Sequence, residues 1–174
     1  MAYTFLKSRG IDVGTSLVED DKLEAARQIT ADAAAKGVEL ALPVDHVVAD
    51  RLEVGSLHTV LAVDDPTIGT RLGVDIGPAT IAKYQALLQD AKTVVWNGPM
   101  GVFEIAAFAK GTNAVAAAVA AVHGTTIVGG GDSIAALRKA GMADKVTHIS
   151  TGGGASLEFL GGQTLPGVAA LADR

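Results

Sequence analysis

Two kinds of apolar pattern alternate along the chain, and glycine or proline separates them. Over residues 20–36 and 79–89 apolar positions recur every three or four residues, which predicts amphipathic helices, the second begun by Pro78. Later, three short runs rich in β-branched residues each lead into a glycine-containing turn and then a helical stretch. These runs are 93–96, 125–128 and 146–149. The repeated order of strand, turn, helix and strand predicts a parallel sheet covered by helices.

The segments between these elements are less regular. Residues 39–49 are apolar but interrupted by Pro43, which predicts a strand followed by an extended segment. Residues 51–77 carry no sustained period and are interpreted as a long connection with one or two short extended pieces. No linker divides the chain, so residues 1–174 are expected to form one α/β domain. The helical stretches that follow the three glycine turns are expected to reach His123, Ala140 and Leu160.

Composition narrows the class of protein. The chain has 174 residues, of which 49% are hydrophobic and 19% charged, and this excludes a disordered tail or a coiled coil. A net charge of -5 argues against nucleic-acid binding. The absence of cysteine excludes disulfide scaffolds, zinc ribbons, iron–sulfur sites and thiol nucleophiles. No apolar run approaches the roughly 20 residues of a membrane span, and no secretory signal opens the chain, so a cytoplasmic protein is expected.

The three glycine turns predict a binding site for a phosphate-bearing ligand. Ligands of open parallel sheets bind outside the carboxyl ends of the strands, where all three turns are expected to lie. Glycine lets the backbone approach a ligand, and the start of the following helix contributes partial positive charge. For one such loop, turning alone would be the simpler explanation. Three loops, two of them with glycine triplets, favour the binding interpretation.

The ligands available in these turns are unusual, because neither of the common glycine-rich phosphate motifs is present and no lysine lies in a turn. A polyphosphate would depend on backbone amides, on Asn97 and on a cation. Asp132 is a candidate ligand of Mg²⁺, although a helix N-cap explains an aspartate there equally well, and Ser133 has the same two interpretations. Glu104 could accept hydrogen bonds from ribose hydroxyls or simply be an acid in a first helical turn. The four histidines are assigned structural roles.

Three long segments resemble phosphoglycerate kinase in content, order and spacing. They are Val95-Trp96-Asn97-Gly98-Pro99-Met100-Gly101-Val102-Phe103-Glu104, Gly129-Gly130-Gly131-Asp132-Ser133 and His148-Ile149-Ser150-Thr151-Gly152-Gly153-Gly154-Ala155-Ser156. Shorter segments at 42–45, 73–78 and 165–168 agree as well. The resemblance extends over essentially the whole chain and identifies it with the C-terminal, nucleotide-binding lobe of that family. It implies an incomplete three-layer α/β/α, Rossmann-like parallel sheet.

The resemblance implies a glycolytic kinase that transfers a phosphoryl group between 1,3-bisphosphoglycerate and ADP, with Mg²⁺, to give 3-phosphoglycerate and ATP. It also implies the role of each matching residue. The nucleotide would be bound by Gly73 and Val74 at the adenine, Glu104 at the ribose, Asn97 at the phosphates, Pro99 at the border of the site, and Gly130, Gly131, Asp132 and Ser133 at the phosphate and the magnesium. Gly152, Gly153 and Gly154 would begin a helix aimed at the transferred group, with Gly153 and Gly154 acting catalytically through their backbone.

The resemblance also implies missing parts. The family's N-terminal lobe, with its basic phosphoglycerate site and catalytic arginine, has no counterpart in this sequence, nor do the opening strands of the nucleotide lobe with their lysine. The chain is therefore expected to be inactive alone and to meet phosphoglycerate only through the missing lobe. One alternative stays open, a nucleotide-binding or complementation module without chemistry. A dinucleotide-binding oxidoreductase is disfavoured, because G-x-G-x-x-G and the acid that follows it are absent.

Overall fold

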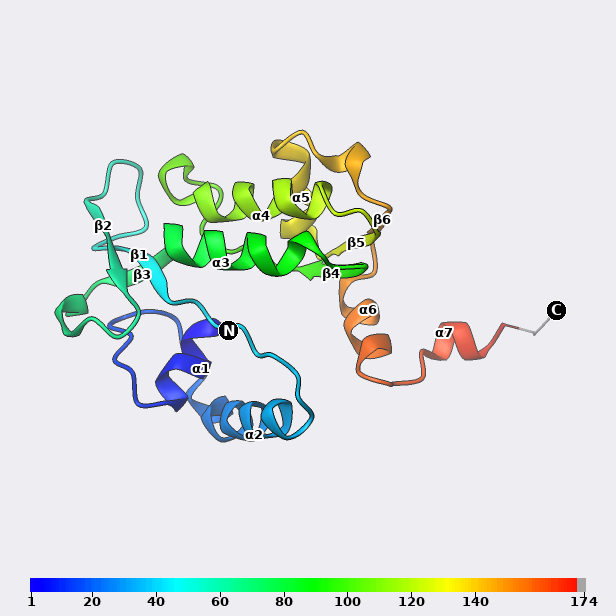
Figure 1. Ribbon diagram of the computed structural model, residues 1–174, viewed down its shortest axis with the longest axis horizontal. Helices are drawn as coiled ribbons and strands as arrows, with labels where there is room; N and C mark the ends of the chain where they lie inside the picture. Colours follow the sequence, from blue (N-terminus) through cyan, green and yellow to red (C-terminus); the bar gives the residue numbers. More distant parts are fainter. Residues whose placement is uncertain (172–174) are drawn as a thin grey trace. The chain divides into compact units, whose positions relative to one another are not determined.

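The computed structural model describes residues 1–171, which form both helices and strands (Figure 1). The strands are β1 (Asp45–Ala49), β2 (His58–Ala62), β3 (Leu72–Ile76), β4 (Thr93–Asn97), β5 (Thr125–Gly129) and β6 (His148–Ser150). The α-helices are α1 (Ala2–Ser8), α2 (Leu23–Ala35), α3 (Pro78–Gln89), α4 (Lys110–Ala120), α5 (Gly131–Lys139), α6 (Gly153–Leu160) and α7 (Pro166–Ala169). Short 3-10 helices occupy Asp20–Lys22, Pro66–Ile68, Ala106–Phe108 and Ala143–Lys145.

The described chain divides into two compact units, each built from two separate stretches of sequence. Unit 1 consists of Met1–Ala86 and Met100–Ala114. Unit 2 consists of Leu87–Pro99 and of the chain from Val115 onward, as far as the structure describes it. Each unit contains one three-stranded sheet. The organisation of residues 1–174 as one domain stays a prediction.

The sheet of unit 1 is antiparallel, with β1 between β2 and β3. All five residues of β1 are buried, and Val47 lies opposite both Val60 of β2 and Asp75 of β3. The core against this sheet combines buried residues of β1 and β3 with Phe108, which is fully buried although it comes from a much later part of the chain. β2 is largely exposed, so β1 and β3 supply most of the apolar surface that this sheet buries.

A buried carboxylate fixes the start of α3. Asp45 of β1 accepts hydrogen bonds from the backbone N–H of Ala79, at 2.9 Å, and of Thr80, at 2.7 Å. The Thr80 hydroxyl in turn accepts the N–H groups of Val44 and Asp45, so strand and helix satisfy each other's free donors. A side chain at Gly77 would collide with the Asp45 carboxyl group. The first turn of α3 is thus capped by a residue distant in sequence.

The sheet of unit 2 is parallel, with β5 between β4 and β6, as the sequence predicts (Figure 1). The strands are in register so that Asn97, Gly129 and Ser150, their last residues, lie side by side. Trp96 and Val128 are buried in the strands, and α5 packs against β5. The predicted α/β fold class is confirmed.

Three local expectations change. The helical stretch expected after the first glycine turn and reaching His123 consists of the 3-10 helix Ala106–Phe108 and of α4, which ends at Ala120. In 39–49 the extended segment precedes the strand instead of following it, because Pro43 lacks the N–H that a ladder needs and pairing begins only at Asp45. The connection at 51–77 contains β2 and β3, and both pair antiparallel with β1. Among the described residues, the longest helices fall short of the length and apolarity required to cross a bilayer.

Candidate functional site

The three glycine turns of unit 2 begin at one edge of its sheet. β4, β5 and β6 are parallel and in register, so the turns after Asn97, Gly129 and Ser150 all start at their carboxyl ends. Helix α5 begins at Gly131 and α6 at Gly153, directly after the second and third turns. The first N–H groups of a helix have no partner inside the helix, so two sets of backbone donors start near this edge.

Close contacts hold the turns together. The N–H of Gly98 donates to the hydroxyl of the fully buried Ser133, at 2.6 Å, which ties the first turn to α5. Gly130 has a φ of 85° and leaves no room for a side chain, since a Cβ would lie 2.5 Å from Oδ1 of Asn97. A Cβ on Gly153 would lie 2.9 Å from both N and Cα of Gly130. Glycine is therefore required at 130 and 153 by neighbouring turns.

Asp132 is exposed in the first turn of α5. The N-cap of this helix is Gly130, and it has no side-chain capping bond, so the interpretation of Asp132 or Ser133 as the N-cap is wrong. The Asp132 carboxylate is free of that capping role and is exposed next to Gly131, where a Cβ would meet no atom within 4 Å, so an exposed hard oxygen donor beside open space fits a Mg²⁺ held between protein and phosphate. Within residues 1–171 no group of three or more acidic or histidine side chains gathers as a metal cluster.

The remaining residues predicted for the phosphate end of the site belong to the same three turns and to the helix starts that follow them. Pro99 follows the Asn97–Gly98 turn, which a hydrogen bond from the Trp96 indole to the Gly98 carbonyl, at 2.7 Å, also holds. Gly152 is the N-cap of α6, and a Cβ on Gly131 or Gly154 would meet no atom within 4 Å. Gly131 and Gly154 therefore leave open space beside the first turns of α5 and α6.

Three predicted residues, Gly73, Val74 and Glu104, lie in unit 1. Gly73 and Val74 border a cavity of about 120 Å³. A side chain at Gly73 would collide with the hydroxyl group of Tyr3, so packing inside unit 1 already requires glycine here. Glu104 is exposed and precedes the 3-10 helix Ala106–Phe108, so it does not lie in the first turn of a helix.

Asp75 is a buried acid of β3 to which the sequence analysis gives no role. It is 4% exposed, and its carboxylate accepts the N–H of Gly111, at 2.8 Å, and that of Ile76, at 2.9 Å. Burial raises the pKa of Asp75 to about 6, although these hydrogen bonds and the charge of Lys110 oppose the increase. A charged residue inside the apolar run 72–76 was the signal that could have identified it.

Tyr3 and His46 form a second buried polar group beside the same cavity. The Tyr3 hydroxyl lies 3.1 Å from Nδ1 of His46, whereas the buried Nε2 of His46 has no hydrogen-bond partner. Burial lowers the pKa of His46, which favours the neutral imidazole. The structural role that the sequence analysis assigns to this histidine agrees with its burial.

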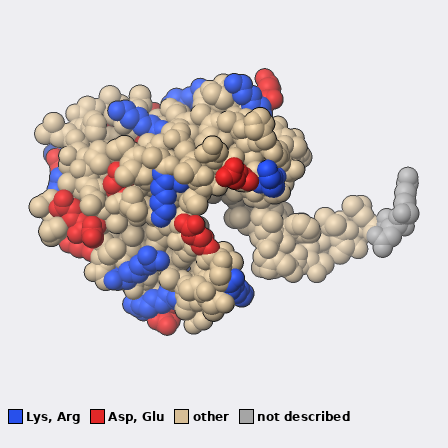
Figure 2. Space-filling model, in the orientation of Figure 1, with Lys and Arg blue, Asp and Glu red and all other residues tan. Residues whose placement is uncertain are grey.

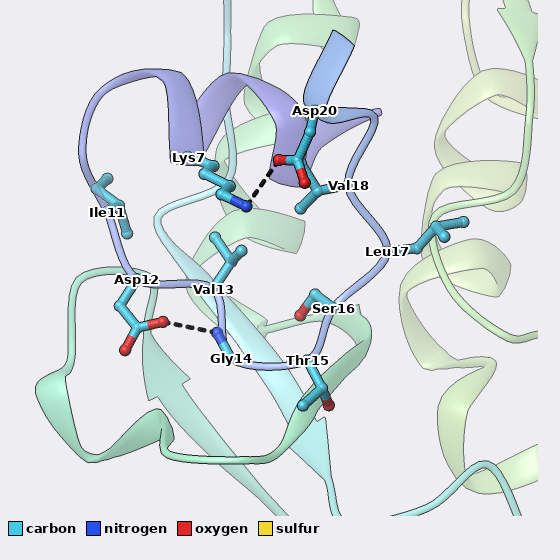
Figure 3. A pocket seen from close by; sticks show the side chains of 10 residues that line it. All are labelled: Lys7, Ile11, Asp12, Val13, Gly14, Thr15, Ser16, Leu17, Val18 and Asp20. Atoms are coloured by element: carbon cyan, nitrogen blue, oxygen red, sulfur yellow. Dashed lines mark hydrogen bonds and ion pairs between the residues drawn. The ribbon is translucent and has the colours of Figure 1, made fainter. Parts of the chain in front are cut away.

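A larger pocket of about 410 Å³ lies elsewhere in unit 1, along the loop between α1 and α2 (Figure 3). Lys7 and Asp20 form an ion pair of 2.7 Å at one side, and the Asp12 carboxylate accepts the N–H of Gly14 at another. None of the residues predicted to bind nucleotide lines this pocket. On the face drawn in Figure 2, the described acidic and basic side chains are interspersed, without a large basic patch.

Comparisons with known proteins agree with the resemblance found in the sequence. The family model described as phosphoglycerate kinase matches residues 1–163. The chain is 57% identical over 175 residues to the phosphoglycerate kinase of Clostridium novyi, with all of this chain and 44% of that protein covered. It is 54% identical to that of Koribacter versatilis, of which it covers 43%. The chain thus spans less than half the length of these curated relatives.

Solved structures give the same result. The phosphoglycerate kinase from Coxiella burnetii matches with a TM-score of 0.92 and 49% identity, over 97% of this chain and 43% of the other. The enzyme from Pyrococcus horikoshii matches with a TM-score of 0.79 and 34% identity, over 98% of this chain and 42% of the other. Family model, sequence identity and fold agree, and this chain belongs to the phosphoglycerate kinase family.

Proposed function

We propose that this chain carries the Mg²⁺–ADP/ATP-binding part of a phosphoglycerate kinase, which transfers a phosphoryl group between 1,3-bisphosphoglycerate and ADP. The observation that carries the proposal is the grouping of the Asn97, Gly130 and Gly153 turns at the carboxyl edge of one parallel sheet. Ligands bind at this edge in open α/β sheets. Backbone donors at the starts of α5 and α6 suit phosphate oxygens.

The chemistry of phosphoryl transfer is compatible with a site of this kind. It requires positioning and charge neutralisation more than a covalent residue. The three turns contain no lysine or arginine, so backbone N–H groups, Asn97 and a metal are the sources of positive potential that they offer. Mg²⁺, held by Asp132, would supply neutralisation of the phosphate charge. Gly153 and Gly154 would direct the amides of α6 toward the transferred group.

The assignment of the nucleoside is proposed from the family resemblance. Gly73 and Val74 would contact the base and Glu104 the ribose. In support, Gly73 and Val74 border a cavity, and Glu104 is exposed and available for hydrogen bonding. Phosphoglycerate would bind to parts of the family's proteins that this sequence does not match. We also propose a cytoplasmic protein, in line with glycolysis.

Replacing Asp132 by alanine is expected to weaken Mg²⁺–ADP binding roughly tenfold, because a charged metal ligand is lost. In EDTA, which removes the metal, the effect of the substitution on ADP affinity should disappear or reverse. Without the metal the carboxylate repels phosphate, so Asp132→Ala should bind ADP as well as or better than the unaltered chain. Isothermal titration of both proteins, with and without Mg²⁺, measures this.

Asp144→Ala is the matched control for this measurement. Asp144 is another exposed acid in the first turn of a helix of unit 2, but it lies in the 3-10 helix Ala143–Lys145, which precedes β6, whereas the three turns follow the carboxyl ends of strands. Its replacement should leave both affinities unchanged. Equal affinities for the Asp132 variant and the unaltered chain in both solutions would remove Asp132 from the metal site.

A second candidate function is nucleotide binding without phosphoryl transfer. The absence of cationic side chains from the three turns favours it for this chain on its own. A coupled assay with 1,3-bisphosphoglycerate and Mg²⁺–ADP separates the two functions. Turnover by the purified chain would establish the kinase, whereas binding without turnover would establish the module that only binds.

A further inference from the structure

The buried carboxylate of Asp75 lies between two glycines that come from the later stretch of unit 1. A side chain at either Gly101 or Gly111 would collide with the Asp75 carboxyl group. Both positions therefore need glycine as long as the Asp75 side chain lies between them. The Gly111 N–H, in the first turn of α4, donates to Oδ2 of Asp75 at 2.8 Å. The carboxylate is the place where β3, the segment 101–104 and the start of α4 meet.

Backbone and hydroxyl bonds continue this connection on both sides of the carboxylate. The N–H of Val102 donates to the carbonyl of Val74 at 2.8 Å, so the segment runs along β3. The fully buried hydroxyl of Thr112 accepts the N–H groups of Met100, at 3.1 Å, and Gly101, at 3.2 Å. The segment that ends in Glu104 is thus attached to β3 and α4 by a small number of identifiable bonds.

We propose that Asp75 is a positioning residue for the nucleotide: its charged carboxylate holds segment 101–104 and the start of α4 against β3, and protonation of this carboxylate loosens both. The inference rests on the proposed nucleotide function, in which Gly73, Val74 and Glu104 contact the nucleoside. It assigns Asp75 no contact with the ligand. The acid acts through the residues on either side of it.

Burying the charged Asp75 carboxylate is energetically unfavourable, and this supports a functional reason for keeping an acid at this position. Burial raises the pKa of Asp75 to about 6, so the folded chain binds this proton more tightly than the unfolded chain does. Burial thus disfavours the charge at neutral pH, but the hydrogen bonds from Gly111 and Ile76 lower the pKa, so these bonds are stronger to the charged carboxylate and weaken when it takes up a proton. A buried acid kept ionised in this way is typical of a functional position.

The other ionisable groups around Asp75 are few. Tyr3 of α1 has its pKa raised by burial and by the charge of Asp75, so it stays neutral. Lys110 of α4 is positively charged and favours the carboxylate. His46 of β1 borders the same cavity, and burial lowers its pKa. The Asp75→Asn variant keeps all three groups, so any contribution of His46 is common to both proteins.

The decisive test compares the pH dependence of Mg²⁺–ADP affinity in the unaltered chain and in Asp75→Asn. If binding needs the ionised acid, only about a tenth of the molecules are competent at pH 5, and affinity should be roughly tenfold lower than at pH 7.5. The variant should bind several-fold more weakly at pH 7.5 and lack this component of the pH dependence. The protonation of ADP itself affects both proteins and cancels in the ratio.

Thr112→Val separates positioning from charge. It removes the acceptor of two N–H groups in the same segment without removing a titrating group. It should weaken binding at every pH and retain the tenfold dependence. Asp12→Asn is the matched control, because Asp12 also accepts a backbone N–H but is exposed and lines a different pocket from the one that Gly101 and Val102 border (Figure 3). It should match the unaltered chain throughout.

An NMR titration without nucleotide tests the link between Asp75 and the segment independently of ligand binding. In the unaltered chain, the amide proton shifts of Gly101, Val102 and Gly111 should titrate together with a midpoint near pH 6. The Gly14 amide, which is bonded to Asp12, serves as an internal reference. Failure of the unaltered chain to bind Mg²⁺–ADP at pH 7.5 would contradict the proposed function. A Gly111 titration that Gly101 and Val102 do not follow, or an Asp75→Asn variant with the pH profile of the unaltered chain, would overturn the role of Asp75.

Discussion

Replacing Gly153 by alanine is expected to reduce the affinity for Mg²⁺–ADP by about a hundredfold and to destabilise the fold by about 2 kcal/mol. The new Cβ would lie 2.9 Å from backbone atoms of Gly130, which cannot rotate away as a side chain can. The turn after β6 must then separate from the turn after β5, and the amides of the two helices no longer lie in their native arrangement. Calorimetric titration and urea unfolding measure the two effects.

Gly154→Ala controls for the stability part of this prediction. The two glycines are adjacent in α6, but a Cβ on Gly154 would meet no atom within 4 Å. Alanine also favours a helix over glycine, by roughly 0.5–1 kcal/mol. The Gly154 variant should therefore unfold at the same or a higher urea concentration. Equal destabilisation by both substitutions would show that the close approach of Gly153 to Gly130 does not account for the loss of stability.

Removal of the Asp45 carboxylate is expected to have the largest effect on stability, about 3–4 kcal/mol for Asp45→Ala. The side chain is buried and accepts two backbone N–H groups at the start of α3. Each buried donor left without a partner costs about 1–3 kcal/mol, and a capping residue is itself worth about 1 kcal/mol. Because the loss is a large fraction of an ordinary domain's stability, thermal unfolding followed by circular dichroism should detect it directly.

Asp65→Ala is the comparison that isolates burial. Asp65 also accepts a helix N–H, from Thr67 at 2.8 Å, as the N-cap of the 3-10 helix Pro66–Ile68, but this hydrogen bond is exposed to solvent. Water can replace an exposed acceptor, so this variant should lose much less stability than the Asp45 variant. A similar loss in both would mean that the buried network between Asp45 and Thr80 contributes nothing beyond a surface cap.

Local sequence rules predicted the parallel sheet well because its signals are local. Each strand of unit 2 is a short apolar run that leads into a glycine turn, and α5 and α6 begin directly after the second and third of these turns. Parallel strands also place their carboxyl ends at one edge, so the common position of the Asn97, Gly130 and Gly153 turns could be predicted. Their closeness could not, because it depends on the hydrogen bond between Gly98 and Ser133 and on glycines at 130 and 153, where a Cβ would collide with a neighbouring turn.

The sheet of unit 1 was harder to predict because its strands lack a clear pattern. β1 is buried throughout, while β2 is almost entirely exposed, so neither shows the alternation that identifies an antiparallel strand. The acids Asp45 and Asp75 lie inside these strands and interrupt the apolar signal. Their partners are backbone groups of α3 and α4, which no local rule connects to them.

The position of Phe108 has a consequence for the chain as it is synthesised. This side chain completes the core formed by Val47, Ala49 and Val74, yet all of unit 2's first stretch, Leu87–Pro99, is translated between β3 and Phe108. On the ribosome, the three strands of unit 1 therefore emerge before the ring that covers them. Until Phe108 follows, their apolar side chains remain accessible to chaperones, and a pause in translation before this codon would prolong that exposure.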